Sequence, residues 1–247
     1  MSILSSLFKS KNREPFDLSN VAVDMHSHLI PGIDDGSESM DHSIGMILRF
    51  KELGYRKLIT TPHVMSDHYK NTPEIIQKGL SEVREELDKL KIDIELEVAA
   101  EYYTDEFFMD KIEEGNLLTF GENNVLFEFS FSAKPRQVNE AIFALKNNGY
   151  QPVLAHFERY AFYLDNGEKA IEDLKNRGVH IQMNLNSLTG HYGKPIKKQA
   201  EMMVDQKLVD YVGSDCHRIE HLNLLEQHLG DPYFHKLENL PLKNKSL

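Results

Sequence analysis

Short segments of β-forming residues alternate along this chain with longer segments whose apolar residues recur at helical spacing. The expected strands lie at residues 21–25, 57–61, 94–99, 125–129, 151–155, 179–184 and 210–213, and the expected helices at 40–53, 73–90, 105–114, 138–147, 167–176, 195–206 and 219–229. Strands joined by helices pair in parallel through right-handed crossovers, so this pattern restricts the fold to the α/β class. An open doubly wound sheet and a closed barrel both fit the alternation.

The length of the chain favours one domain. The 247 residues match the size at which α/β barrels fold as a single unit. We expect residues 21–240 to form that domain, residues 1–20 to form a polar and flexible leader, and residues 241–247 to form a short tail.

The net charge, the first residues and the single cysteine indicate which partners and which cellular compartment to expect. The net charge of −11 repels nucleic-acid backbones and anionic lipids, so we expect no nucleic-acid partner. The first residues lack the cleavage site of a signal peptide, and Cys216 has no second cysteine with which to form an intrachain disulfide. We therefore expect a cytoplasmic protein that contacts a membrane at most indirectly or through its leader.

Metal-binding side chains follow six of the seven expected strands. They are His26, His28 and Asp35 after the first strand, then His63, Glu101, Glu128 and His156 after the next four, and Asp215 and His217 after the last. Because the carboxyl ends of parallel strands meet at one edge of a sheet, we expect these side chains to form one active site.

The donor types indicate the chemistry. Imidazole and carboxylate ligands without thiolates suit Mn²⁺, Fe or Zn²⁺, and nine candidates are too many for one ion. Two or three ions that share carboxylates can stabilise both the attacking and the leaving oxygens of a phosphoryl transfer. Arg136 and Arg159 follow strands in loops and can bind phosphate oxygens through two parallel hydrogen bonds. The sequence therefore predicts a hydrolase of phosphate esters.

The segment DMHSHLIPGIDDGS at residues 24–37 resembles the opening motif of PHP (polymerase and histidinol phosphatase) domains. More narrowly it resembles the CpsB/CapC branch, whose further motifs are matched in order by TTPH at 60–63, AE at 100–101, LFEF at 126–129, PR at 135–136, HFER at 156–159 and GSDCH at 213–217. The resemblance implies a distorted seven-stranded (β/α) barrel of PHP type, with the active site at the carboxyl ends of the strands.

The same resemblance implies a site and an activity. The implied ligands of a manganese centre are His26, His28, Asp35, His63, Glu101, Glu128, His156, Asp215 and His217, and the implied phosphate-binding residues are Arg136 and Arg159. The implied reaction is hydrolysis of phosphotyrosine on a bacterial tyrosine autokinase that controls capsule or exopolysaccharide synthesis. The phosphorylated tail of that kinase would be the partner.

The expected mechanism uses a hydroxide whose pKa the cations lower, with attack on phosphorus in line and with charge neutralisation by Arg136 and Arg159. His63 or His217 is the candidate that protonates the leaving oxygen. A cysteine-dependent phosphatase needs an arginine six residues after its cysteine, whereas Leu222 stands there after Cys216. A small-molecule phosphatase, such as a histidinol phosphatase, is the alternative function, and a binding module with a relic metal site is another.

Several assignments stay open on the sequence alone. Either Arg218 or His221 could replace an arginine that some family members place after the last motif. Asp35 shares a turn with Asp34, and either carboxylate could serve only to cap that turn. Glu158 is expected to lie behind the ligands or at the surface.

Overall fold

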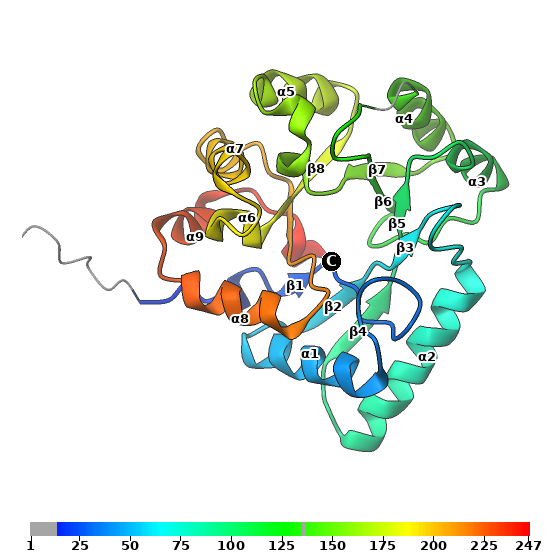
Figure 1. Cartoon of the computed structure of the whole chain (residues 1–247), viewed down its shortest axis with the longest axis vertical. Helices are drawn as coiled ribbons and strands as arrows, with labels where there is room; N and C mark the ends of the chain where they lie inside the picture. The colour runs from blue at the N-terminus through cyan, green and yellow to red at the C-terminus, as the bar shows by residue number, and fades with distance from the viewer. Residues whose placement is uncertain (1–13, 135–136) are drawn as a thin grey trace, which may run out of the picture.

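Short strands, all paired in parallel, form two curled sheets in the computed structural model, which describes residues 14–134 and 137–247 (Figure 1). One sheet has the order β1 (Val23–Asp24), β2 (Lys57–Thr60) and β4 (Glu95–Val98). The other has the order β3 (His63–Val64), β5 (Glu101–Tyr103), β6 (Asn124–Glu128), β7 (Gln151–Leu154), β8 (His180–Asn184) and β9 (Tyr211–Gly213). The predicted α/β class and parallel pairing are confirmed.

The predicted count of seven strands is not confirmed, because two of the expected strand positions are each divided. β2 and β3 are separated by Thr61 and Pro62, and a proline has no N–H to donate to a ladder. β4 and β5 are separated by Ala99 and Ala100. The chains stay adjacent across both gaps, since the Ala99 amide donates to the Thr60 carbonyl at 2.9 Å and the Glu101 amide to the Pro62 carbonyl at 3.1 Å.

The outer ends of the two sheets also meet. Beyond β1 and β9, the Asp215 amide donates to the His26 carbonyl at 2.8 Å and the His28 amide donates to the Cys216 carbonyl at 2.9 Å. Segments from the start and the end of the chain therefore lie side by side where both carry candidate ligands.

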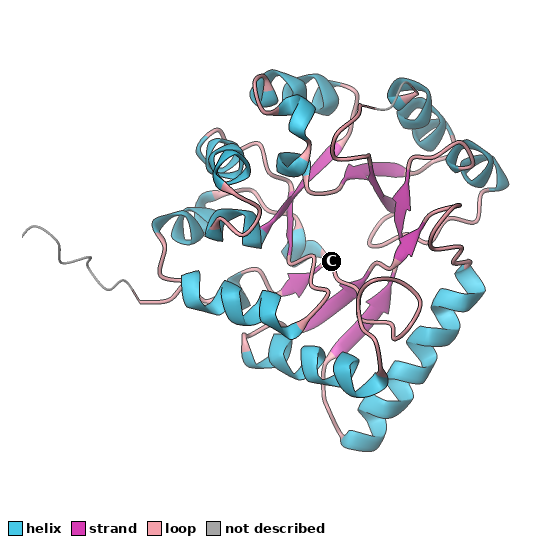
Figure 2. Cartoon of the chain, in the orientation of Figure 1, coloured by secondary structure: helices cyan, strands magenta, loops and turns pink. Residues whose placement is uncertain are grey.

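Helices surround the strands on the outside of the curl (Figure 2). They are α1 (Met40–Glu52), α2 (Pro73–Leu90), α3 (Phe108–Glu114), α4 (Val138–Asn147), α5 (Gly167–Asn176), α6 (Leu185–Thr189), α7 (Lys194–Asp205), α8 (Ile219–His228) and α9 (Pro232–Lys236). Short 3₁₀ helices occur at Leu18–Asn20, Phe157–Arg159, Ala161–Tyr163, Leu237–Asn239 and Asn244–Ser246. Local capping sets the boundaries: the Ser39 hydroxyl caps α1, and Thr72 followed by Pro73 begins α2.

Alternating side chains divide the core between the two faces of the sheets. Val125 and Phe127 belong to a large apolar cluster, whereas Leu126, between them on β6, belongs to a smaller one with Val153 and Met25. Because successive side chains of a strand point to opposite faces, the two clusters lie on opposite faces of the sheet.

Both ends of the described chain pack against these sheets. Phe16 is buried, and its amide donates to the Leu229 carbonyl at 2.9 Å. Asn244 is also buried, and its Nδ2 donates to the carbonyls of Val23 at 3.0 Å and Val212 at 2.7 Å. This side chain thereby joins β1 to β9.

Over the described ranges, no helix has both the length and the apolar character needed to cross a bilayer. Most of the expected leader, residues 1–13, lies outside the described residues.

Candidate metal centre

All nine predicted ligands come together at the carboxyl ends of the strands. They fall into four overlapping groups, within each of which the candidate ligand atoms lie within 4.8 Å of one another. The groups are His28, Asp35, His63 and His217; His26, His28 and Glu101; His26, His156 and Asp215; and His63, Glu101 and Glu128. His26, His28, His63 and Glu101 each belong to two groups.

The positions of these residues follow from the strand ends. Glu128 closes β6, while His63 and Glu101 open β3 and β5 just beyond the two divided positions. His156 and Asp215 follow β7 and β9, and both have left-handed backbone conformations, with φ of 33° and 51°. Such φ values are unfavourable for residues with a Cβ, and residues held in them concentrate at functional sites.

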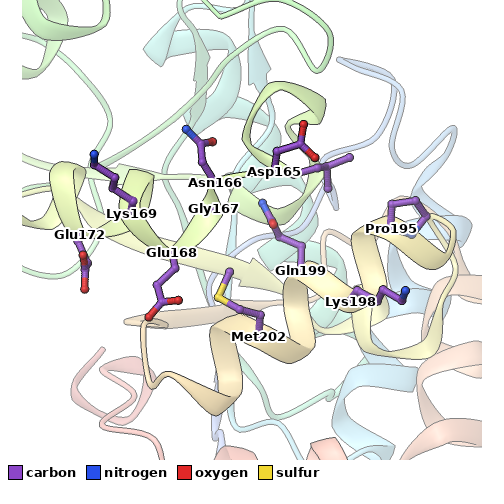
Figure 3. Close-up of a pocket in the computed structure, with 11 residues that line it drawn as sticks. Asp165, Asn166, Gly167, Glu168, Lys169, Glu172, Pro195, Lys198, Gln199 and Met202 are labelled. Atoms are coloured by element: carbon purple, nitrogen blue, oxygen red, sulfur yellow. The ribbon is translucent and has the colours of Figure 1, made fainter.

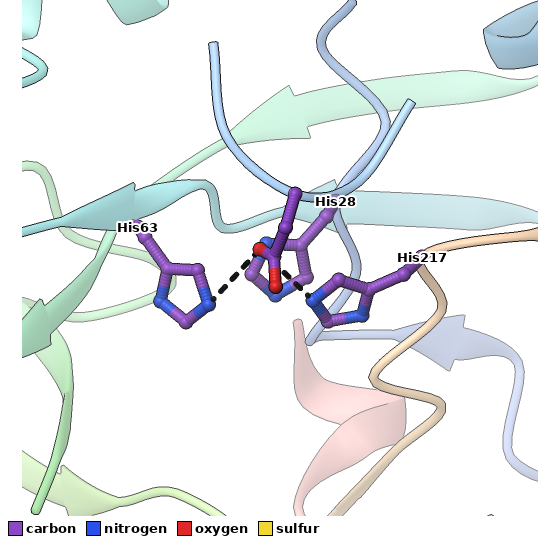
Figure 4. Close-up of side chains that lie close together, drawn as sticks. His28, His63 and His217 are labelled. Atoms are coloured by element: carbon purple, nitrogen blue, oxygen red, sulfur yellow. Dashed lines mark ion pairs between the residues drawn. The ribbon is translucent and has the colours of Figure 1, made fainter. Parts of the chain in front are cut away.

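Asp35 is the most exposed of the nine, with 53% of its side chain accessible. It shares a ligand group with His28, His63 and His217, whose imidazoles lie close together (Figure 4). Its Oδ1 lies 3.5 Å from Nε2 of His63 and 3.5 Å from Nε2 of His217. The hydrogen bond from His217 outweighs desolvation and holds the pKa of Asp35 below its usual range. The carboxylate therefore stays ionised at neutral pH.

Glu101 is the centre of the cluster and is buried. Its Oε2 lies 3.1 Å from Nε2 of His26, and its Oε1 lies 2.9 Å from Nε2 of His156. Burial alone would raise the pKa of Glu101, but His26 and His63 outweigh it and hold that pKa well below its usual range. In turn, burial alone would lower the pKa of His63, whereas Glu101 and Glu128 raise it to about 9.

These residues fit a group of divalent cations. Buried carboxylates are costly unless positive charge is nearby, and here three of them share one space with five imidazoles. Nδ1 of His63 is buried and makes no hydrogen bond within the described structure, but it lies 3.3 Å from both Glu101 Oε2 and Glu128 Oε1, as ligands of one ion would. Nitrogen and oxygen donors without sulfur suit Mn²⁺, Fe or Zn²⁺.

Asp34 and Asp35 have different roles in their shared turn. Asp34 Oδ2 lies 2.8 Å from Nδ1 of His28, and the same carboxylate accepts hydrogen bonds from the amides of Gly36 and His63 at 3.0 and 3.2 Å. Asp34 thus organises the turn and orients an imidazole, while Asp35 faces the cluster.

Sequence reasoning missed two amides on β8, the strand for which it found no ligand. Gln182 Oε1 accepts the amide of His156 at 2.7 Å and lies 3.2 Å from Nδ1 of His26. Asn184 Nδ2 donates to Asp215 Oδ2 at 2.7 Å. Their spacing of two residues on a buried strand is the signal that could have identified them, because it places both on one face.

The structure describes only one of the two predicted phosphate-binding arginines. Arg159 lines the site, and its Nη1 donates to Asp215 Oδ2 at 2.8 Å. Arg136 lies outside the described residues. Of the two candidates to replace a further arginine, Arg218 is exposed, whereas His221 Nδ1 accepts the amide of His217 at 3.4 Å.

Glu158 is fully buried behind the ligands. Its Oε1 accepts hydrogen bonds from the Asn184 amide at 2.9 Å and from the Ser187 hydroxyl at 2.5 Å. It therefore lies in the layer that supports Asn184, and not at the surface.

All of the candidate ligands except His26 and His28 line an open cavity of about 330 Å³, whose other walls include Tyr69, Tyr103 and Phe131. A larger cavity of about 850 Å³ lies between α5 and α7, lined by polar residues that include Asp165, Lys169, Lys198 and Gln199 (Figure 3). None of the four candidate ligand groups found in the described residues lies there, so the side-chain chemistry, and not the volume, makes the smaller cavity the candidate site.

Comparison with known proteins agrees with this geometry. The family model for capsular polysaccharide synthesis, CpsB/CapC, matches residues 22–228. The tyrosine-protein phosphatase YwqE of Bacillus subtilis is 29% identical over 206 residues, which cover 83% of this chain and 81% of YwqE. The tyrosine-protein phosphatase CpsB of Streptococcus pneumoniae is 28% identical over 208 residues, which cover 80% of this chain and 84% of CpsB.

A solved structure shows the same fold. It comes from crystal structures of YwqE from Bacillus subtilis and CpsB from Streptococcus pneumoniae, described as unique metal-dependent tyrosine phosphatases. The match has a TM-score of 0.75 at 27% identity and covers 90% of this chain and 94% of the other. Since the family model spans most of the sequence, this chain belongs to the CpsB/CapC family of capsular polysaccharide synthesis.

Proposed function

We propose that this protein is a metal-dependent phosphotyrosine-protein phosphatase. The observation that carries the proposal is the convergence of nine imidazole and carboxylate side chains, seven of which line one open cavity together with Arg159. The relatives named as tyrosine-protein phosphatases support this substrate class over a small phosphorylated metabolite.

The nine residues would hold two or three ions, and Mn²⁺ is our candidate, with Fe or Zn²⁺ as chemically compatible substitutes. Bound cations would supply positive charge for the phosphoryl oxygens and would lower the pKa of an attacking water. The protein's own contribution is to fix the donors: Asp34 orients His28, Gln182 orients His26, and Asn184 holds Asp215.

Arg159 supplies the other part of the mechanism. It lies at the same cavity as the candidate ligands, and its planar guanidinium can donate to the equatorial phosphoryl oxygens as negative charge shifts in the transition state. Arg136, which follows β6 in the sequence, is proposed as a second phosphate-binding residue. Either His63 or His217, which both line the cavity, is proposed to protonate the departing tyrosyl oxygen. A phenol has a pKa of about 10, so this step is less demanding than for an alkyl ester.

The proposed substrate is the phosphorylated tail of a bacterial tyrosine kinase that acts in capsule or exopolysaccharide synthesis. The family description and the tyrosine phosphatase names of the relatives support this partner. We place the reaction in the cytoplasm, where Cys216 would stay a buried thiol, and any membrane contact would be indirect or through the leader.

We also propose that the two sheets act as one distorted barrel with seven strand positions. This counts β2 with β3 and β4 with β5, and the hydrogen bonds between the segments after β1 and β9 support it. Residues 21–240 would then be one catalytic domain, preceded by the leader at 1–20, with residues 241–247 packed against it.

The test is the kcat/KM of metal-stripped and Mn²⁺-reconstituted enzyme on a tyrosine-phosphorylated peptide and on histidinol phosphate, each with and without chelator. We expect chelator-sensitive turnover that favours the peptide by about tenfold or more, which equals about 1.4 kcal/mol of transition-state discrimination. The reverse preference would replace the proposal with a small-molecule phosphatase, and no turnover of either would leave a binding module.

A matched pair of variants ties the activity to the cluster. His26→Ala removes a candidate ligand shared by two groups and should abolish turnover. His42→Ala removes an imidazole from the outer helix α1 and should leave turnover unchanged. Equal activity of the two variants would contradict the proposed site.

A further inference from the structure

The guanidinium of Arg159 lies between two aromatic rings. Its Cζ lies 4.2 Å from the centroid of the Phe131 ring and 4.4 Å from the centroid of the Tyr192 ring. Three separate segments meet here, since Arg159 ends the 3₁₀ helix after β7, Phe131 lies in the loop after β6, and Tyr192 lies between α6 and α7. We refer to Phe131 and Tyr192 as the aromatic pair.

A guanidinium that contacts aromatic rings through its faces keeps its edge free. All five N–H groups of an arginine point outward in the plane of the group, so rings above and below do not compete with hydrogen-bond acceptors. One of these donors, on Nη1, goes to Asp215, and the side chain lines the cavity of the candidate metal centre. Donors in the same plane remain for a second anion at that cavity.

The backbone around each ring is held in place. The Phe131 carbonyl accepts the Ala161 amide at 3.0 Å, which ties the ring to the segment just after Arg159. Tyr192 stands between Gly190 and Gly193, whose φ values of 90° and 99° favour glycine, and the Gly193 amide donates to the Gly190 carbonyl at 2.9 Å. A closed turn thus presents the ring of Tyr192 to Arg159.

Packing of the core accounts for only part of the position of the Phe131 ring, which stacks on the buried ring of Tyr160 with centroids 6.0 Å apart. This side chain is 40% exposed, so it buries less apolar surface than a core phenylalanine would. Its contacts also include the guanidinium and the imidazole of His156, whose ring centroid is 5.3 Å away.

We propose that Phe131 and Tyr192 are positioning residues that hold the guanidinium of Arg159 edge-on to the cavity, where it binds the phosphoryl group of the substrate. The inference rests on the proposed function for the identity of the substrate. Its prediction about anion binding, however, can be measured without turnover.

The test measures binding of inorganic phosphate to the Mn²⁺-loaded enzyme by calorimetry. Phe131→Leu and Tyr192→Leu each remove one stacked ring, and each should weaken phosphate binding by about fivefold to tenfold, in line with a partly desolvated cation–π contact. The conservative variants Phe131→Tyr and Tyr192→Phe keep the rings and should stay within about twofold of the wild type. Phe143→Leu, which changes an exposed phenylalanine on α4, is the matched control and should have no effect.

A double-mutant cycle separates positioning from general packing. In an Arg159→Lys background no planar group remains to be stacked, so Phe131→Leu should change phosphate binding much less than it does in the wild type. An equal effect in both backgrounds, or no effect of either leucine variant in the wild type, would overturn the proposal. If a leucine variant fails to fold in a melting experiment, the cycle is run with Phe131→Met and Tyr192→Met, under the same criterion.

The same variants distinguish this inference from the proposed function. Loss of phosphate affinity in the leucine variants of an enzyme that turns over histidinol phosphate and not the peptide would keep the positioning role and reject the tyrosine phosphatase. If the enzyme turns over the peptide, but neither the phosphate affinity nor the KM depends on the aromatic pair, the tyrosine phosphatase would be kept and the positioning role rejected.

Discussion

One carboxylate, Asp34, accounts for the orientation of two candidate ligands. It lies against Nδ1 of His28 and accepts the backbone amide of His63. A carboxylate behind a ligating imidazole fixes the tautomer and raises the basicity of the ligand nitrogen. We therefore expect Asp34 to strengthen ion binding, although it belongs to none of the four ligand groups.

Asp34→Asn should weaken Mn²⁺ binding by about 10-fold to 100-fold, because a neutral amide cannot replace the charged acceptor behind His28. The measurement is a titration of the metal-stripped protein with Mn²⁺. Asp41→Asn, in the first turn of α1, is the control and should bind Mn²⁺ as the wild type does. Equal affinities of the two variants would show that Asp34 serves the turn alone.

For single residues, the sequence predicts the candidate metal ligands better than it predicts the side chains that hydrogen-bond to them. His26, His63 and Asp215 could be predicted because strand ends converge whatever the details of packing. Gln182 and Asn184 could not be predicted in the same way, since their value depends on which atoms face them across β7 and β9. Their spacing of two residues predicts that both amides lie on one face of the strand, but it does not predict which atoms they contact.

Local hydrogen bonds and single residues explain why some helices and strands begin or end at other residues than the sequence predicts. The helix expected at 105–114 begins at Phe108, because the carboxylate of Asp105 accepts the amides of Ser66 and Phe107 and holds the preceding turn. α6 was not predicted, since five residues directly after a strand are too short to show a helical period. The divided strands have a visible signal in Pro62, whereas Ala99 and Ala100 carry none.

Replacing glycine by alanine should have opposite effects on stability at two helical positions. A Cβ at Gly45 in α1 meets nothing within 4 Å, so Gly45→Ala should stabilise the fold by about 0.5 to 1 kcal/mol through helix propensity. A Cβ at Gly79 in α2 would lie 2.2 Å from Cγ2 of Ile30, which is buried. Gly79→Ala should therefore destabilise by about 1 to 3 kcal/mol.

Urea denaturation of both glycine variants measures these free energies of unfolding. Each variant is the control for the other, because both substitutions bring the same gain in helix propensity and differ only in the space around the new methyl group. Stabilisation by Gly79→Ala would mean that α2 moves away from Ile30 at little cost.

In the whole molecule, the end of the chain completes the junction between β1 and β9. Asn244→Ala removes the donor to Val23 and Val212 and the acceptor of the Val212 amide. Each of the three buried backbone groups left unpaired costs about 1 to 3 kcal/mol, so we expect a loss of at least about 3 kcal/mol. Asn239→Ala, at an exposed position, should change stability by less than about 0.5 kcal/mol.

Metal removal should also lower the stability of the whole molecule. An ion that binds only the folded state adds about 2.7 kcal/mol when its free concentration is 100 times its dissociation constant. We expect the Tm to rise with Mn²⁺ and to fall with chelator, with a much smaller response in Glu101→Gln, which alters two ligand groups. A Tm that ignores Mn²⁺ in the wild type would contradict ion binding by this cluster.

The overlap of the four ligand groups has a consequence for counting ions. His26, His28, His63 and Glu101 each take part in two groups, whereas Asp35, Glu128, His156, Asp215 and His217 each take part in one. A substitution in the first set disturbs two positions at once, so the stoichiometry of such a variant should fall by more than one ion. Asp35 and His156 belong to groups with no member in common, so the metal content of their variants can assign individual ions to individual positions.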